Sequence, residues 1–389
     1  MVMAPVEESQ LPAGALELLI IQPTPFCNLD CDYCYLPGRE ARTRMAPEIL
    51  RHVFRRTFES SIVGDAFTVV WHAGEPLVLP ISFYEEALQI LGEENKYGVH
   101  VRHSFQTNAT LLTAAWCEFL LKRDLAIGVS VDGPEFLHDR HRKTRSGRGT
   151  WQQVVRGIRL LNDHAVPFHV ITVLTADSLD YPDELFDFYV EHGVRKLAFN
   201  IEEIEGPHVT SSLSGEMAGR RYLRFLDRFF DLVESSGNGI SVREFDFAFA
   251  AMAHAGKGPC RGAQQTTPFG IVSVDCRGNF STFSPELLGL ADPRFGSFAF
   301  GNVMTDPFES ALGRPGFQAV AREVAAGVER CRATCEYFPH CGGGAPVNKL
   351  FENGGFDTAE TLFCRLSIQA PLDLVLRKVT GKCASSKAA

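Results

Sequence analysis

The sequence predicts an α/β fold in which parallel strands form a partial barrel of about six βα units. Between residues 16 and 205, short apolar runs alternate with longer segments of helical periodicity, a pattern typical of parallel βα units. A complete eight-unit barrel takes about 250 residues, so this stretch holds about six units. The chain of 389 residues is 45% hydrophobic and 22% charged, which is ordinary for a globular protein.

Each predicted strand is a short buried run, and each predicted helix carries an apolar stripe. The strands are Leu16–Gln22, Phe67–Trp71, Ser104–Thr107, Ile127–Val131, Phe168–Leu174 and Lys196–Ile201. The helices between them are Glu48–Ser60, Ser82–Glu93, Ala114–Arg123, Trp151–His164 and Tyr181–His192. In such barrels the chemistry takes place at the C-terminal ends of the strands.

The pattern changes after residue 205. We expect five parts: a loose lead-in at 1–15, the partial barrel at 16–205, a linker with a bridging helix at 206–255, a metal-organised second domain at 256–370, and a helix end with a disordered tail at 371–389. The linker contains one clear helix, Met217–Ser235. The second domain opens with a Gly-rich break around Cys260 and continues with short strands at Gly270–Val274 and Asn279–Phe283.

Composition and charge restrict the compartment and the partners. The net charge of −9 argues against nucleic acid as a partner, and no apolar run is long enough for a membrane span or resembles a signal peptide. Eleven cysteines in a chain without a secretion signal favour metal binding over disulfides. We therefore expect a cytoplasmic protein, because the cytoplasm keeps thiols reduced.

Three cysteines follow the first predicted strand: Cys27, Cys31 and Cys34, with the spacing C-x3-C-x2-C. A [4Fe–4S] cluster normally takes four thiolates, so a cluster held by these three leaves one iron open to a small molecule, as catalytic zinc sites do. A zinc site or buried thiols are the alternatives. Structural zinc usually takes paired C-x2-C knuckles, and no second pair follows nearby, which favours the cluster.

The spacing resembles the signature of the radical S-adenosylmethionine (SAM) enzymes, which implies that SAM binds the open iron and that Tyr33 stacks on its adenine. Trp71–Leu77, at the end of the second strand, resembles the Gly-Gly-Glu-Pro element that holds the amino group of SAM, although Ala73 replaces the first glycine. Gly74 lets a ligand approach the backbone closely, and Glu75 can accept hydrogen bonds from an ammonium group. Taken alone, this segment would be a strand-ending turn with a solvated glutamate.

Polar residues at the next strand ends are further candidates for SAM binding. Asn108 follows the third strand, and Ser130 and Asp132 end the fourth; side chains there can bond ribose hydroxyls or a carboxylate. Arg142 follows in an arginine-rich run, and an Arg fork can clamp the carboxylate of SAM. The alternative for each arginine of the run is a solvated charge. Val173, at the end of the fifth strand, either flanks the adenine or belongs to the core.

The resemblance also implies the type of reaction. The reduced cluster passes one electron to the sulfonium of SAM, and the resulting 5′-deoxyadenosyl radical abstracts a hydrogen from an unactivated carbon. The protein supplies position and excludes water. Ferredoxin-type clusters reach about −400 mV, so an external donor such as a flavodoxin or ferredoxin is required.

A second set of cysteines lies near the C-terminus and supplies four thiolates: Cys331, Cys335, Cys341 and Cys364. This number closes a [4Fe–4S] site, and zinc with four thiolates is the alternative. Gly342–Gly344 lets the backbone wrap closely around Cys341. The pattern resembles the SPASM domain, the auxiliary-cluster extension of peptide-modifying radical SAM enzymes.

Two departures from the SPASM pattern reduce the expected number of clusters. A full SPASM domain carries seven cysteines and two auxiliary clusters, but Phe283 and Ala345 stand where two of its cysteines are expected. Cys260 and Cys276 remain as possible ligands of a further cluster, and two thiolates do not make four. We therefore expect one auxiliary [4Fe–4S] cluster.

The whole chain resembles the SPASM peptide maturases that install three-residue cyclophanes (the GrrM type). This resemblance rests on Ile21–Cys27, Val70–Leu77, Phe199–Gly206 and Phe283–Gly289. It implies an oxidoreductase acting on a ribosomally made precursor peptide. The radical would take a β-hydrogen from a residue two positions after an aromatic residue, and the carbon radical would then form a C–C bond with the ring.

Completion of that crosslink releases one proton and one electron. The auxiliary cluster is the expected electron acceptor, and a base must take the proton. Glu202 and Glu203, at the end of the sixth strand, and Glu286, in the second domain, are the candidates. The alternative for each is a solvated loop carboxylate.

Other functions remain open from the sequence. Another radical SAM peptide modification, such as thioether formation or epimerisation, would use the same motifs. Maturation of a sulfatase by formylglycine formation is disfavoured, because Phe283 replaces a cysteine and Ser284 stands where those enzymes carry an acidic base. A non-catalytic iron–sulfur scaffold or electron carrier would need no SAM-binding elements.

Overall fold

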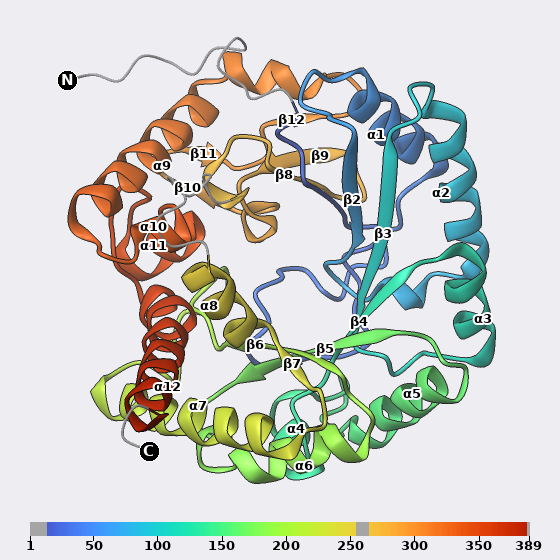
Figure 1. Ribbon diagram of the computed structural model, residues 1–389. Helices are drawn as coiled ribbons and strands as arrows, with labels where there is room; N and C mark the ends of the chain where they lie inside the picture. Colours follow the sequence, from blue (N-terminus) through green and yellow to red (C-terminus); the bar gives the residue numbers. More distant parts are fainter. Residues whose placement is uncertain (1–13, 254–263, 387–389) are drawn as a thin grey trace.

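The computed structural model describes residues 14–253 and 264–386, and the side chains as far as residue 381. Its main feature is a ten-stranded sheet with the strand order β12-β9-β8-β1-β2-β3-β4-β5-β6-β7. The eight strands from β8 through β1 to β7 are all parallel. The sheet curves around an interior space without closing on itself, and the helices α1 to α7 lie outside it (Figure 1).

All six predicted strands of the barrel are present. They are β1 (Leu18–Ile21), β2 (Ala66–Trp71), β3 (His100–Thr107), β4 (Ala126–Ser130), β5 (Phe168–Leu174) and β6 (Lys196–Ile201). The covering helices are α1 (Pro47–Glu59), α2 (Ile81–Glu94), α3 (Ala114–Arg123), α4 (Glu135–His141), α5 (Trp151–Asp163), α6 (Pro182–Glu191) and α7 (Glu216–Ser236). β3 begins at His100 rather than at Ser104, because the polar start of this strand pairs with β2 along its whole length.

The core lies between the outer face of the sheet and these helices. Helical spacing places Leu50, Val53 and Phe54 on one face of α1, where each is fully buried. On the sheet, Trp71 packs edge-on against Tyr84 of α2 with ring centroids 5.2 Å apart. The parallel strands are thus covered on the outside, and their C-terminal ends stay available for a site.

The sheet continues beyond the six predicted units in both directions. β7 (Ser241–Val242) pairs with β6, and α8 (Arg243–Ala253) follows it within the segment expected to be a linker. The structure forms a helix there because Phe245 is buried against Phe230 of α7, with ring centroids 5.1 Å apart. On the other edge β8 (Ile271–Val274) adds in parallel to β1, followed by antiparallel β9 (Asn279–Thr282) and β12 (Gly301–Asn302).

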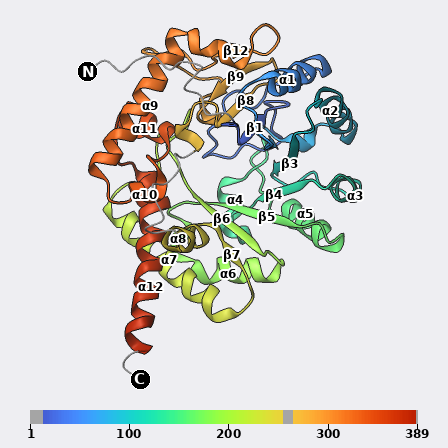
Figure 2. The ribbon, with the colours of Figure 1, turned by 45° about the horizontal axis from the view of Figure 1, so that its top comes forward.

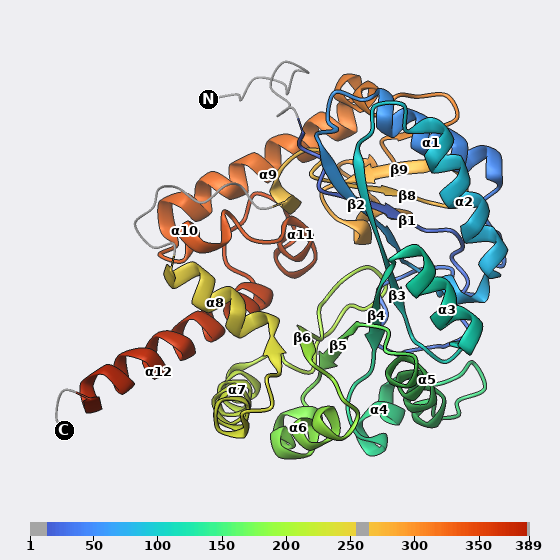
Figure 3. The same ribbon diagram turned by 45° about the vertical axis from the view of Figure 1, so that its right-hand side comes forward.

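The C-terminal region is mostly helical. It comprises the small hairpin β10 (Ala291–Asp292) and β11 (Gly296–Ser297), then α9 (Pro315–Thr334), α10 (Phe338–Cys341), α11 (Pro346–Asn353), a π-helix (Cys364–Gln369) and α12 (Ala370–Ser386). Helices α9 to α11 lie on the opposite side of the sheet from α1 and α2 (Figure 3).

The end of the chain differs from the expectation of a disordered tail. The helix α12 runs through Ser386 and projects from the body of the molecule (Figure 2). Residues 387–389, like Cys260 and the Gly-rich break, lie outside the described residues. Within the described part of the chain, no helix has the length and apolarity needed to span a bilayer.

Candidate active site and cysteine centres

The loop after β1 carries the first three cysteines, and its backbone is fixed by bonds to neighbouring segments. The amide of Cys27 donates to the carbonyl of Arg39 at 3.0 Å, and the Arg39 guanidinium donates to the carbonyl of Cys31 at 3.1 Å. Cys27, Cys31 and Cys34 are all free thiols. The loop therefore presents three unpaired thiols at the C-terminal end of β1.

These thiols suit a metal–sulfur group better than they suit a plain core. The amide of Leu29 lies 3.4 Å from the Cys27 sulfur and Asn108 Nδ2 lies 3.8 Å from it, and such donors stabilise anionic cluster sulfurs. Burial raises the pKa of Cys27 and of Cys31 to about 12, and a bound metal would offset this cost by stabilising the thiolates. Within the described residues, no three His, Cys, Asp or Glu side chains gather closely enough to bind a single ion.

The turn after β2 lies directly against the cysteine loop. Gly74 has φ of +86°, and a Cβ there would lie 2.3 Å from the carbonyl oxygen of Thr24, so only glycine fits. The Glu75 carboxylate accepts hydrogen bonds from the Leu77 amide (2.9 Å), the Thr107 hydroxyl (2.7 Å) and the Asn108 amide (2.8 Å). Burial raises its pKa to about 7. Glu75 thus ties the ends of β2 and β3 together, and its contact with the ammonium of SAM stays a prediction.

Asn108 joins the same network. Its side-chain amide donates to Asn28 Oδ1 at 2.9 Å, and its Oδ1 accepts from the amide of Thr110 at 3.0 Å. It therefore orients the cysteine loop from the end of β3.

A buried ion pair follows β4. Arg142 donates from Nε to Asp132 Oδ2 at 2.9 Å and from Nη2 to Oδ1 at 3.1 Å. The Tyr33 hydroxyl donates to Asp132 Oδ2 at 2.5 Å, and the Arg142 guanidinium lies 5.4 Å from the Tyr33 ring centroid. Burial alone would raise the pKa of Asp132, but Arg142, His138 and the Tyr33 hydroxyl together outweigh it and hold that pKa below its usual range. The pair fixes the Tyr33 ring beside the cysteines.

One cavity of about 250 Å³ gathers most of the predicted SAM and base residues. Its lining includes Cys31, Cys34, Tyr33, Ser130, Arg142, Val173, Glu202, Glu203 and Glu286. Glu75, Asn108 and Asp132 do not line it and instead hold the residues that do. Ser130 accepts a hydrogen bond from Gln106 at 2.9 Å, which fixes its hydroxyl at the cavity wall.

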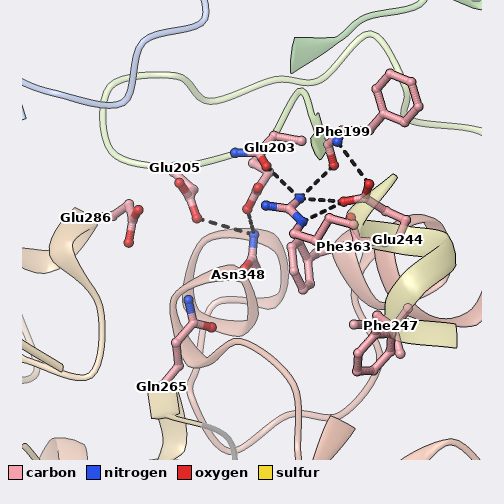
Figure 4. Close-up of a pocket in the computed structure, with 13 residues that line it drawn as sticks. Phe199, Glu203, Glu205, Glu244, Phe247, Gln265, Glu286, Asn348 and Phe363 are labelled. Carbon is pink, nitrogen blue, oxygen red and sulfur yellow. Dashed lines mark hydrogen bonds and ion pairs between the residues drawn. The ribbon is translucent and has the colours of Figure 1, made fainter. Parts of the chain in front are cut away.

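A second cavity of about 360 Å³ adjoins the first, between β6, α8, α11 and the π-helix (Figure 4). The two cavities share the side chains of Asn200, Glu203, Glu205 and Glu286. Phe199, Phe247 and Phe363 supply apolar wall to the second cavity. The two cavities therefore meet at these four residues, with the cysteine loop on the side of the first and the C-terminal helices on the side of the second.

Three carboxylates stand at the junction of the two cavities. Asn348 of α11 donates to Glu203 Oε2 at 2.7 Å and lies 3.4 Å from Glu205 Oε1, and Glu286 lies nearby (Figure 4). Burial raises the pKa of Glu203, Glu205 and Glu286, and their mutual repulsion raises those of Glu203 and Glu205 further. This group, Glu203–Glu205–Glu286, is the carboxylate cluster below.

The structure separates the three glutamates predicted as the base. Glu203 and Glu286 belong to the carboxylate cluster, whereas Glu202 has other partners. Glu202 accepts hydrogen bonds from the Ser212 amide at 2.7 Å and from His208 at 3.1 Å, and from the Ser212 hydroxyl, so it holds the loop after β6. Glu205 was not among the predicted candidates. It lies two positions after Glu203, and the period-two alternation of extended chain was the signal that could have paired them.

The second set of cysteines surrounds its own cavity, of about 390 Å³, which all four residues line. Cys331 lies in the last turn of α9 and Cys335 caps that helix, Cys341 ends α10 and Cys364 begins the π-helix, so three backbone segments converge there. A Cβ on Gly344 would lie 3.3 Å from the Cys364 sulfur, which shows how closely the backbone approaches. Four thiols that line one cavity match the number of ligands that a [4Fe–4S] cluster takes.

The remaining cysteines and the two substituted positions lie elsewhere. Cys276 is buried in the turn between β8 and β9 and does not line the four-cysteine cavity. Phe283 is fully buried and stacks on Phe317 with centroids 6.1 Å apart. Ala345 precedes α11 and is buried. Buried side chains, Phe283 and Ala345, thus fill the two positions at which the SPASM pattern led us to expect cysteines.

Comparison of the sequence with known proteins gives one family and several relatives. The sequence model of the Radical SAM superfamily matches residues 21–189. The uncharacterized protein sll1766 of Synechocystis sp. is 43% identical over 373 residues, which are 93% of this chain and 92% of that protein. The serine-type anaerobic sulfatase-maturating enzyme of Klebsiella aerogenes is 34% identical over 212 residues, or 52% of each chain.

Solved structures show the same fold. The structure described as native anSMEcpe with bound AdoMet superposes with a TM-score of 0.75 at 21% identity, covering 94% of this chain and 98% of the other. Streptococcus suis SuiB bound to precursor peptide SuiA gives a TM-score of 0.64 at 15% identity, over 90% of this chain and 76% of the other.

Proposed function

We propose that this chain, whose residues 21–189 match the Radical SAM superfamily model, is a radical SAM enzyme that modifies a ribosomally made precursor peptide by joining an aromatic ring to the β-carbon of a residue two positions later. The observation that carries the proposal is the pair of adjoining cavities. Cys31 and Cys34 line the first cavity, and the carboxylate cluster lines both.

The cysteines fit the two groups that this reaction needs. Cys27, Cys31 and Cys34 would hold a [4Fe–4S] cluster with SAM, and the four later cysteines would hold one auxiliary [4Fe–4S] cluster. Bound there and reduced by a flavodoxin or ferredoxin in the cytoplasm, the first cluster would supply the electron for SAM cleavage, and thereby the 5′-deoxyadenosyl radical that would take the β-hydrogen.

The residues around the first cavity position SAM and exclude water. Arg142 and Asp132 hold the Tyr33 ring in place for stacking on the adenine, with Val173 on the cavity wall. Gly74 lets the turn after β2 pack against Thr24, which would bring the backbone of this turn to the amino group of SAM. Ser130 is oriented by Gln106 towards the same cavity and can bond the ribose.

The pair Glu203 and Glu205 accepts the proton that leaves the ring when aromaticity is restored. Two buried carboxyls bound to one amide, Asn348, share a proton readily, because both cannot ionise cheaply side by side. The raised pKa values make an ionised member of the pair a stronger base than a solvated glutamate, and so suit it to accept a proton near neutral pH.

The second cavity supports a peptide substrate. Its apolar wall of Phe199, Phe247 and Phe363, with polar groups from Gln265 and Arg243, offers both side-chain and backbone contacts to an extended segment. The names of the relatives also describe action on proteins or on precursor peptides.

Formylglycine formation on a sulfatase is the second candidate, favoured by the 34% identity to the Klebsiella aerogenes enzyme. Its weakness is chemical. Phe283 is buried in an aromatic stack, and Ser284 hydrogen-bonds Glu286, so the cysteine and acid expected at these positions are missing.

Co-expression with a short peptide that carries aromatic-x-polar triplets, followed by tandem mass spectrometry, separates the two functions. A crosslink removes two hydrogens and suppresses backbone fragmentation between the joined residues. Oxidation of serine to formylglycine also removes two hydrogens, but it leaves fragmentation intact and gives an aldehyde that reacts with a hydrazide probe. An unmodified peptide, despite formation of 5′-deoxyadenosine, would overturn the crosslinking proposal.

A further inference from the structure

We propose that Lys349 sets the reduction potential of the auxiliary cluster by donating a hydrogen bond from its ammonium group to the thiolate of Cys331. The inference rests on the proposed function in one respect: it requires a cluster at the four cysteines. It does not depend on which peptide is modified.

Lys349 lies on α11 and points into the four-cysteine site. Its Nζ is 3.2 Å from the Cys331 sulfur, and its side chain is only 1% exposed. The space for it depends on glycine: a Cβ on Gly327 of α9 would lie 3.2 Å from Lys349 Nζ and 2.1 Å from the carbonyl oxygen of Phe356. The backbones of α9 and of the segment after α11 therefore enclose the ammonium group.

The charge of Lys349 has no carboxylate to balance it. Within the described residues, no ion pair joins Lys349 to an Asp or Glu, although a buried ammonium is costly unless it is paired. The Cys331 sulfur is the partner of its Nζ. Four thiolates around a [4Fe–4S] core leave the site with net negative charge, so a loaded site supplies the balance that the protein does not.

Such a contact shifts a potential in a known direction. Reduction adds one negative charge to the site, and a buried cation with a hydrogen bond to sulfur stabilises the reduced state more than the oxidised state. Lys349 therefore raises the potential and makes the cluster a better electron acceptor.

The place of Lys349 on α11 connects this effect with the active site. The preceding residue, Asn348, holds Glu203 and Glu205 with its amide, while Lys349 contacts Cys331. In the proposed reaction the ring adduct loses one proton and one electron as it becomes aromatic again. The proton goes to the carboxyl pair and the electron to the auxiliary cluster, so one short helix contacts both acceptors.

Potentiometric titration followed by electron paramagnetic resonance tests the inference on the reconstituted full-length protein. The Cys27→Ala/Cys31→Ala/Cys34→Ala variant identifies the auxiliary signal. Lys349→Met removes the charge and the donor with little change in volume, Lys349→Gln keeps a neutral donor, and Lys122→Met on the exposed face of α3 is the matched control.

We expect Lys349→Met to lower the equilibrium constant for one-electron reduction of the auxiliary cluster at least tenfold, which corresponds to about 59 mV. Lys349→Gln should recover part of the shift, and Lys122→Met should show none. If Lys349→Met loses its iron, the Lys349→Gln titration decides in its place.

Two results would overturn the inference. One is an unshifted auxiliary potential in Lys349→Met, or in Lys349→Gln where it decides, with full iron content. The other is absence of iron from the triple-alanine variant; in that case crosslinking by the unmodified protein, measured separately, would still test the proposed function.

Discussion

Replacing both Glu203 and Glu205 with glutamine should separate SAM cleavage from crosslink formation. The double variant keeps the size of both side chains but removes the two carboxyls of the carboxylate cluster that contact Asn348, and leaves Glu286 in place. SAM binding and hydrogen abstraction do not use these groups. The step that needs them is loss of the ring proton.

The magnitude follows from the role of the pair. A positioned general base contributes about 10²–10⁴ in rate, or about 3–5 kcal/mol of transition-state stabilisation. Either single variant should lose less of the crosslinking rate, because the remaining carboxyl still lies beside Asn348 and can take the proton. Stability should not be the cause, since burial and repulsion already disfavour ionisation of both groups.

The assay compares two products in one anaerobic reaction, 5′-deoxyadenosine and crosslinked peptide. We expect their ratio to rise at least a hundredfold in the double variant, in line with loss of a general base. Equal loss of both products, or an unchanged ratio, would refute the assignment of the proton acceptor.

Glu202→Gln is the matched control, because Glu202 lines the same first cavity but bonds the Ser212 amide and His208. It should change stability or the peptide KM and leave the product ratio unchanged.

Further predictions concern stability, metal content and pH. Gly74→Ala should lower Tm and weaken SAM binding, since its Cβ would clash with Thr24, whereas Gly38→Ala, also at positive φ but with no atom within 4 Å, should cost only about 1–2 kcal/mol. Asp132→Asn leaves Arg142 buried and unpaired and should cost about 3–5 kcal/mol in thermal unfolding, against about 1 kcal/mol or less for Asp292→Asn in the more exposed pair with Arg294. Iron analysis should give about eight atoms per chain, about four in Cys335→Ala and about eight in Cys276→Ala; about four or about twelve in the unmodified protein would contradict the cluster count. The folded-state pKa of Glu203 and of Glu205 lies above the usual 4.5, so their contribution to stability is present below pH 4.5 and is lost as pH rises through neutrality. The double glutamine variant should therefore have a higher Tm than the unmodified protein at about pH 8, and this difference should become smaller towards pH 5. A difference in Tm that does not change with pH would contradict the raised pKa values.

The barrel could be predicted because each βα unit has a recognisable local sequence pattern. Phe168–Leu174 and Lys196–Ile201 are strands with the predicted bounds, since buried parallel strands are continuous apolar runs. The short strands at the two edges of the barrel were harder to predict from the sequence. β7 has two residues and no periodicity to detect, and the parallel pairing of β8 with β1 joins segments about 250 residues apart.

The cysteine sets were visible for the same reason, because spacing within a loop is a property of the sequence. The carboxylate cluster was not. Glu203, Glu286 and Asn348 come from three distant segments, and only tertiary packing brings them to one junction. The role of Lys349 could not be predicted either, since a lysine in a short helix gives no sign that Gly327 of α9 leaves room for its buried ammonium group.

The central claim is that the radical generated at the first cysteine site takes a β-hydrogen from a peptide. Its most direct test uses a precursor peptide deuterated at the β-carbon of the residue two positions after the aromatic. We predict that 5′-deoxyadenosine will gain one deuterium while the peptide becomes crosslinked. Crosslinked peptide with unlabelled 5′-deoxyadenosine would contradict the claim.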